Sequence, residues 1–289
     1  MSEAIFILVS GIITGTVYAV FAAGLSLVYG TSRILNFAYG SFYMMAAYLA
    51  WFLVVRLELN YAVAAMVLLP ALFLIGLVVD HLVIRRLRQS ENWKLVSMMG
   101  TLGLALILDN AALVAFGPEQ RSIPPISSNV VQMGPMFIGV QEIAIFFIAI
   151  VAIVALELFL RTAPLGQAMR AVSQDMQGAS MVGIGVDRVF AVAFGLSLVL
   201  VGIAALTLSP VTLVSPQAGW PLFLKAFVIV VFGGLGSING ALIAALILGV
   251  TETAVIYYLG TSWTMLVWLL VLVIVLMVRP KGLLGVWGV

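Results

Sequence analysis

Side chains able to perform chemistry are scarce in this chain of 289 residues. Cysteine is absent and histidine occurs once, as His81, so we expect neither thiol chemistry nor a metal site built from several histidines. His81 lies near Arg85 and Arg86 without a nucleophile or a metal-binding cluster, and we assign it no catalytic role. The phosphate loop of an ATPase requires Gly-Lys followed by Ser or Thr, and no Gly-Lys pair occurs. The sequence therefore predicts no enzymatic activity, no metal and no cofactor in this chain.

Ionisable side chains inside long apolar segments are the remaining candidates, because their burial in a membrane is costly and is a functional hypothesis by default. Asp109, followed by Asn110, lies within the apolar segment 95–116, and Glu252 lies within the segment 241–259. Each carboxylate could line a pathway, hold a substrate ammonium group or take part in proton coupling. Each could also be a hydrogen-bonded group that packs helices together, which is the interpretation we favour. The sequence names no partner for either carboxylate.

The elements that position these side chains are strongly apolar. Hydrophobic residues make up 64% of the chain and charged residues 8%, where a soluble domain carries roughly a quarter of charged residues. A helix of about 20 mostly apolar residues crosses a bilayer, and several stretches without Asp, Glu, Lys or Arg are long enough, namely 4–32, 34–55, 59–79, 189–224, 226–251 and 253–278. We therefore predict an all-α, polytopic membrane protein, in which residues 1–289 form one transmembrane domain of about eight to ten spans.

Other classes of protein fit the sequence poorly. The short segments of alternating polarity that are typical of an outer-membrane barrel are missing. The net charge of +2 gives no basic face for nucleic acid. No basic region precedes the first apolar stretch, so we expect residues 4–32 to be retained as a span rather than removed as a signal peptide.

Basic residues in short loops indicate which side of the membrane faces the cytoplasm. Nine of the 13 lysines and arginines fall in the segments 85–94 and 161–188 and in the C-terminal tail. We therefore place these segments and the C-terminus in the cytoplasm, in a multi-pass protein of the inner membrane. The connection 117–141 carries Arg121 as its one basic residue and is rich in Pro and Gly, so we place it outside. The side of the N-terminus is left open.

Two polar, glycine-containing breaks interrupt the apolar stretches, one near residues 30–41 and the other near 233–240. The apolar piece 222–234 is too short to cross alone, which predicts a broken or re-entrant helix. Paired breaks point to the substrate path of a transporter, although small residues equally allow close helix packing. On the first interpretation the pathway residues are Asn36, Phe37, Gly40, Ser41, Gly233, Gly234, Gly236, Ser237, Asn239 and Gly240.

The segment 161–188 contains an amphipathic pattern. Its apolar residues recur at helical spacing, at Met169, Val172, Met176 and Ala179, and glycine ends the pattern at Gly183. A helix of this kind must bury its apolar stripe, and its basic residues are too few for strong adhesion to anionic lipid. We therefore predict that the stripe inserts into a groove on a partner protein.

Several motifs recur together over nearly the whole chain. They are Gly11–Gly15 with Tyr18 and Ala19, Gly24–Gly30, Asn36–Gly40, the loop Gly166–Arg188, Lys225–Phe227, and Gly233–Ser237 with Gly240. Together they resemble the permease subunits of high-affinity branched-chain amino-acid ABC importers. The resemblance implies alternating-access transport of branched-chain or related amino acids, with ATP and Mg²⁺ bound by partner ATPases. Tyr39 and Ser41 depart from the family, which commonly has His and an acidic residue there.

The resemblance also implies partners. These are a second, similar permease subunit, cytoplasmic ATPase subunits, an extracytoplasmic substrate-binding protein and the lipid membrane. The ATPase contact would lie in the loop 166–185, at Gly166, Met169, Arg170, Val172, Asp175, Met176 and Gly183.

One alternative function stays open at this point. A stand-alone secondary transporter or channel for a small polar solute would use Asp109 or Glu252 for ion coupling and would need no ATPase. The sequence also leaves the substrate open among leucine, isoleucine, valine, other amides and urea.

Overall fold

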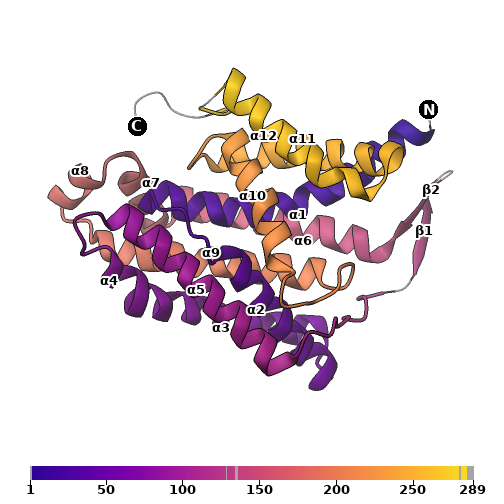
Figure 1. Cartoon of the computed structure of the whole chain (residues 1–289), viewed down its shortest axis with the longest axis horizontal. Helices are drawn as coiled ribbons and strands as arrows, with labels where there is room; N and C mark the ends of the chain where they lie inside the picture. Colours follow the sequence, from indigo (N-terminus) through magenta and orange to yellow (C-terminus); the bar gives the residue numbers. More distant parts are fainter. Residues whose placement is uncertain (1, 128, 134–135, 280, 285–289) are drawn as a thin grey trace.

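The computed structural model describes residues 2–127, 129–133, 136–279 and 281–284. The chain forms a bundle in which most long helices run along one axis (Figure 1). The long helices are α1 (Ser2–Ser32), α3 (Tyr61–Val79), α5 (Trp93–Phe116), α6 (Val140–Thr162), α9 (Val186–Leu208), α11 (Ile238–Leu259) and, together with the 3-10 turn before it, α12 (Thr264–Val278). The shorter helices are α2 (Tyr39–Trp51), α4 (Arg85–Leu87), α7 (Pro164–Gln174), α8 (Met176–Met181) and α10 (Gly219–Gly233).

Short irregular turns and one hairpin complete the fold. The π-helical turns η1 (Phe52–Arg56) and η2 (Asp80–Ile84) extend α2 and α3, and the 3-10 turn η3 (Thr261–Trp263) precedes α12. The strands β1 (Val130–Met133) and β2 (Met136–Gly139) pair antiparallel within the connection that was predicted as an external loop.

Within the described residues, 7 helices are long and apolar enough to cross a membrane. The helix α10 is shorter, and α2 with its π-helical extension is not among the 7, so the structure agrees with the predicted all-α bundle of about eight to ten segments. The helix α9 runs through the middle of the bundle, where 72% of its most apolar stretch of 18 residues is buried. For α12 the buried share is 6%, so that helix has its apolar surface free for lipid or for another subunit.

Glycines allow the central helices to touch backbone to backbone. A methyl group built on Gly249 of α11 would lie 2.5 Å from Cα of Gly15 on α1. Likewise, a methyl group on Gly76 of α3 would lie 2.7 Å from Cα of Gly195 on α9. Close contacts of this kind are the usual basis of helix association in lipid, where no hydrophobic force drives helices together.

The two ends of the bundle differ (Figure 1). One end carries α7 and α8, and we call it the α7–α8 end. The opposite end carries the β1–β2 hairpin and the first turns of α1, and we call it the hairpin end. The helix α1 therefore begins at the hairpin end, whereas α12 finishes about midway along the bundle, on its outer side (Figure 1).

Candidate functional site

The first break is a buried, non-helical segment at residues 33–38, which we call the inner segment. Side chains of the protein bond part of its backbone: Asn36 Oδ1 accepts a hydrogen bond from the Ala38 amide at 3.0 Å, and Thr101 Oγ1 accepts one from the Phe37 amide at 3.2 Å. Irregular backbone at membrane depth is tolerated only where it is buried in protein or lines a wet cavity. The predicted discontinuity is therefore confirmed, and the chain resumes as α2 deep in the bundle (Figure 1).

Three residues around the start of α2 are buried and form hydrogen bonds within the chain, namely Asn36, Tyr39 and Ser41. Asn36 is 2% exposed. Tyr39 donates a hydrogen bond to the Phe21 carbonyl on α1 at 2.8 Å, and Ser41 donates to the Ala105 carbonyl on α5 at 3.4 Å. The two residues that depart from the family pattern thus hold α2 against its neighbours.

A small cavity of about 20 Å³ borders the inner segment, and we call it the inner cavity. Asn36 and Thr101 line it together with Asp80 and Arg88, which form an ion pair at 3.2 Å. Both side chains of the pair are nearly inaccessible, at 3% and 9% exposure. Sequence reasoning did not select this pair, because residues eight positions apart are not neighbours on a regular α-helix, and the π-helical turn η2 changes the register between them.

Phe37 of the inner segment is partly exposed and begins an aromatic stripe that ends in a carboxylate. Its ring centroid is 5.7 Å from that of Phe223 on α10, which in turn lies 6.1 Å from that of Trp220. The Trp220 indole donates a hydrogen bond to Asp109 Oδ2 on α5 at 2.8 Å. The stripe formed by Phe37, Phe223, Trp220 and Asp109 places aromatic surface and one carboxylate beside the first break.

Asp109 is therefore a hydrogen-bonded group at a helix contact, as the packing interpretation predicts, and it also remains partly exposed. The neighbouring Asn110 is exposed and donates a hydrogen bond to the Leu106 carbonyl of its own helix at 2.7 Å. The pathway role of Asp109 stays a prediction.

The second break, between α10 and α11, is a tight glycine turn. Gly234 and Gly236 have φ values of 107° and 83°, a conformation that favours glycine. Ser237 caps α11, because its Oγ accepts a hydrogen bond from the Gly240 amide at 3.1 Å. Asn239 is exposed on the first turn of α11. The break is thus present as predicted.

The glycines predicted to admit substrate face other backbones instead. A methyl group on Gly40 would lie 2.5 Å from the carbonyl oxygen of Gly219 at the start of α10. One on Gly233 would lie 2.3 Å from the carbonyl carbon of Gly240, and one on Gly236 would lie 3.1 Å from Cα of Gly30. The close approach that these residues allow is therefore an approach between helices, and their pathway role stays a prediction.

The C-terminal tail closes the end of α10, which sequence reasoning did not foresee. Leu283 donates a hydrogen bond from its amide to the Phe232 carbonyl at 2.7 Å, and Leu284 donates to the Gly233 carbonyl at 3.0 Å. The last carbonyls of a helix lack intrahelical partners, so these bonds satisfy the C-terminus of α10.

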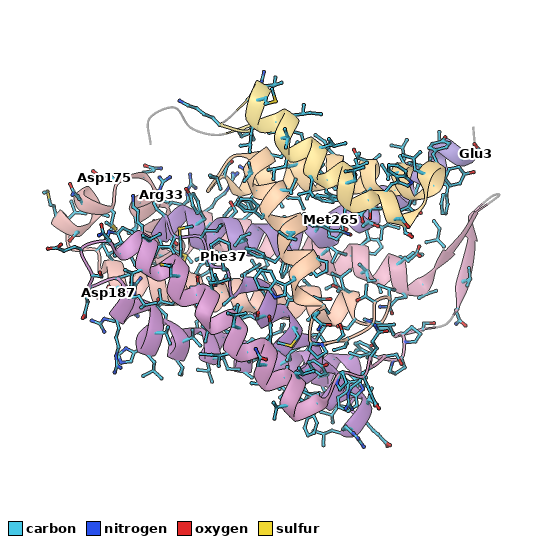
Figure 2. The ribbon with its side chains drawn as sticks, in the orientation of Figure 1. Glu3, Arg33, Phe37, Asp175, Asp187 and Met265 are labelled. Atoms are coloured by element: carbon cyan, nitrogen blue, oxygen red, sulfur yellow. The ribbon has the colours of Figure 1, made fainter. Side chains whose placement is uncertain are left out.

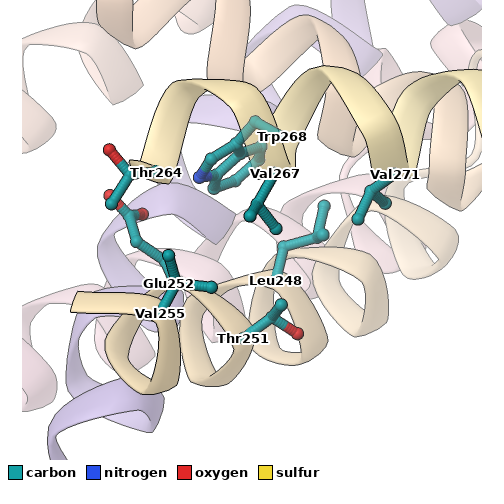
Figure 3. Close-up of a pocket in the computed structure, with 8 residues that line it drawn as sticks. All are labelled: Leu248, Thr251, Glu252, Val255, Thr264, Val267, Trp268 and Val271. Atoms are coloured by element: carbon teal, nitrogen blue, oxygen red, sulfur yellow. The ribbon is translucent and has the colours of Figure 1, made fainter. Parts of the chain in front are cut away.

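Glu252 is paired with Lys225, the charged residue within the short helix α10. The Lys225 ammonium donates hydrogen bonds to Glu252 Oε1 at 2.6 Å and to the Tyr18 hydroxyl on α1 at 2.8 Å. Glu252 is 6% exposed and borders a small pocket between α11 and α12, where its carboxylate points toward Thr264 (Figure 3). The pair could have been predicted from the sequence, because Lys225 and Glu252 have opposite charges and each lies alone in an apolar helix.

The amphipathic segment differs from the prediction in how its apolar stripe is covered. It forms two helices, α7 and α8, that are separated at Asp175, whose Oδ1 caps α8 by accepting a hydrogen bond from the Gln177 amide at 3.0 Å. Met169 and Val172 are buried against α1, α6 and α9 of the same chain, so they do not need a groove on a partner. Gly166 is buried where α7 turns against the end of α6.

The exposed residues of this segment form a different surface. Four of the predicted contact residues are exposed, namely Arg170, Asp175, Met176 and Gly183. Within this segment, the most exposed large apolar side chains are those of Met181 and Val182, at 85% and 78%. Unpartnered apolar side chains at the end of a membrane bundle, flanked by charged residues, form a surface suited to a protein partner.

Comparison with known proteins shows the family. The family described as "Branched-chain amino acid transport system / permease component" matches residues 7–276. The high-affinity branched-chain amino acid transport system permease protein LivH of Salmonella typhimurium is 30% identical, with 96% of this chain and 94% of LivH covered. The corresponding permease protein LivM of the same organism is 29% identical, with 93% of this chain and 68% of LivM covered.

A solved structure shows the same fold at low sequence identity. PsaBC from Streptococcus pneumoniae, solved in complex with Fab, superposes with a TM-score of 0.52 at 14% identity, and the match covers 94% of this chain and 91% of that chain. The match over residues 7–276 and the identity to LivH lead to one conclusion: the chain belongs to the family of branched-chain amino acid transport system permease components.

Proposed function

We propose that this chain is a membrane subunit of an ATP-driven importer that carries branched-chain or related amino acids by alternating access. The observation that carries the proposal is the aromatic stripe of Phe37, Phe223, Trp220 and Asp109 beside a broken helix, in a chain of this family. A broken helix gives two arrangements of the same elements at modest cost, which alternating access requires.

The stripe suits a zwitterion with an apolar side chain. The rings of Phe37 and Trp220 offer apolar surface to an aliphatic side chain, which gains free energy by leaving water. The Asp109 carboxylate accepts one hydrogen bond from Trp220 through Oδ2. On this proposal, its other oxygen accepts a charge-assisted hydrogen bond from a substrate ammonium group. A carrier fed by a binding protein needs only such a sparse polar lining.

The orientation follows from charge. Most of the 13 basic residues, among them Arg161, Arg170 and Arg188, belong to the α7–α8 end, so we place that end and the C-terminus in the cytoplasm. The start of α1 and the hairpin end then face outward, where a substrate-binding protein would dock. A second permease subunit would pair with this one in the membrane.

Cytoplasmic ATPase subunits, which bind the ATP and Mg²⁺, would dock on the exposed surface of α8 that includes Met181 and Val182. The test is co-purification of a tagged chain expressed with the neighbouring ATPase and permease subunits. Met181→Glu should release the ATPases, because a charge then replaces an apolar contact at the centre of the interface. Val211→Glu is the matched control, since Val211 is 54% exposed in the loop before α10, away from α8.

The proposal fails if the wild-type chain never retains ATPase subunits and transports substrate without them. Proteoliposomes that contain only this chain, with an imposed proton or sodium gradient, measure this directly. Gradient-driven uptake under those conditions would support the stand-alone transporter instead.

A further inference from the structure

A single arginine joins the inner segment to α7. Arg33, the first residue of the inner segment, donates a hydrogen bond from Nη2 to the Ser173 carbonyl at 2.8 Å, although the two residues are 140 positions apart in the chain. Figure 2 shows Arg33 at the α7–α8 end, close to Asp175, with Phe37 deeper in the bundle. The bond therefore links the proposed ATPase-docking helices to the segment that carries Phe37.

The Ser173 carbonyl is a favourable acceptor for a cation. Ser173 lies in the last turn of α7, which ends at Gln174, and the last carbonyls of a helix carry the negative end of its dipole. A guanidinium group at that position makes a charge-assisted bond and stabilises the helix terminus. A displacement of this terminus consequently acts on Arg33.

The backbone of Arg33 has a left-handed conformation. Its φ is 55°, which is uncommon for a residue other than glycine and costs free energy that the surrounding contacts must offset. The residue stands where α1 stops and the inner segment begins, so a change in its backbone angles redirects residues 34–38. A hinge in a switching protein is typically such a position at the terminus of an element.

The inner segment borders a small cavity on one side. The inner cavity has space for about one water molecule and is lined by Asn36, Asp80 and Arg88. One face of the segment is therefore less closely packed than the rest of the interior. At its far end the segment is anchored, because Gly40 at the start of α2 packs on the Gly219 backbone.

We propose that Arg33 is a positioning residue that transmits displacement of α7 and α8 to the inner segment, and so couples ATPase turnover to movement of Phe37 in the substrate path. The inference rests on the proposed function, since it requires that α8 contacts the ATPases. In this arrangement Arg33 couples the two regions without itself touching the ATPases or the substrate.

The first test measures uptake per ATP hydrolysed by the complete transporter in proteoliposomes. Arg33→Gln removes the charge and the long donor, and it should lower uptake per ATP about tenfold while ATPase subunits remain bound, which is the loss expected for one charge-assisted hydrogen bond. Arg33→Lys keeps a cation that can reach a carbonyl, and it should recover part of the ratio. A merely structural role would lower assembly and both rates together.

The matched control is Arg86→Gln. Arg86 lies at the same end in α4 and is exposed, and its side chain makes no hydrogen bond or ion pair among the described residues. It should leave uptake per ATP unchanged. A wild-type ratio in Arg33→Gln, or an equal loss in Arg86→Gln, would overturn the inference.

The second test uses hydrogen exchange of backbone amides in the assembled transporter, with and without a non-hydrolysable ATP analogue. In the wild type, the nucleotide should change exchange in α8 and in residues 33–38. In Arg33→Gln, the change in α8 should persist and the change in residues 33–38 should vanish. If residues 33–38 respond equally in both proteins, or do not respond in the wild type, the inference is wrong. Failure of the wild type to retain ATPases would instead refute the proposed function.

Discussion

In the ion pair of Lys225 and Glu252, removing the lysine should destabilise the protein more than removing the glutamate. Lys225→Met leaves the Glu252 carboxylate, 6% exposed, without its closest hydrogen-bond donor. Breaking a buried pair in this way costs about 3–5 kcal/mol, which corresponds to a lowering of Tm by roughly 10 °C. Glu252→Gln should cost less, about 1–2 kcal/mol, because Lys225 is 19% exposed on its side chain and keeps its bond to Tyr18 at 2.8 Å.

The double variant Lys225→Met with Glu252→Met separates charge from packing. Two apolar side chains of similar length fill the space of the pair without a buried charge, and such replacements are often neutral or stabilising by about 1–4 kcal/mol. Thermal unfolding in nanodiscs should therefore show that the double variant recovers most or all of the stability that Lys225→Met loses. A double variant no more stable than Lys225→Met would refute the reasoning, because the loss would then not come from an unpaired charge.

The same variant tests the role of Glu252 in transport. If the pair serves only to hold α10 against α11 and α1, uptake by the assembled transporter should return with stability. A stable double variant without uptake would show that the carboxylate itself is needed, and it would favour the ion-coupled alternative.

Three other substitutions have expected outcomes. Gly40→Val should prevent stable folding, because its first side-chain carbon would lie 2.5 Å from a backbone oxygen of α10, whereas Gly103→Val should be tolerated since nothing lies within 4 Å; yield of folded protein after size-exclusion chromatography compares them. Asp109→Asn should raise the leucine concentration for half-maximal uptake about tenfold by removing a charge-assisted contact, whereas Trp220→Phe should have a smaller effect; equal kinetics in Asp109→Asn would contradict the proposed ammonium contact. Ser237→Ala should lower stability by about 1 kcal/mol through loss of a helix cap, measured by thermal unfolding, and an unchanged Tm would contradict that role.

Much of the architecture follows from local properties of the sequence. The apolar stretch predicted at 95–116 corresponds to α5 (Trp93–Phe116), and the short piece predicted at 222–234 corresponds to α10 (Gly219–Gly233). These elements are predictable because the need for internal backbone hydrogen bonds in lipid converts an apolar run directly into a helix. Both breaks were predictable as well, because glycines and polar residues interrupt the apolar stretches there.

The amphipathic segment shows where a local pattern becomes ambiguous. Its period correctly indicated that Met169 and Val172 share a buried face. The pattern contains no information on whether the covering surface belongs to the same chain, and the structure shows that it does. Met181 and Val182, which lie beyond the apolar stripe, are the residues that remain strongly exposed.

The sequence by itself determined the membrane class, the family and the places where helices are broken, because each depends on residues that are neighbours along the chain. Only the tertiary structure decided which side chains meet: Lys225 with Glu252, Asp80 with Arg88, and Arg33 with the end of α7. Such pairs depend on the rotation and crossing of helices far apart in sequence. Those angles are set by the close packing of many small contacts, and no local period of the sequence records them.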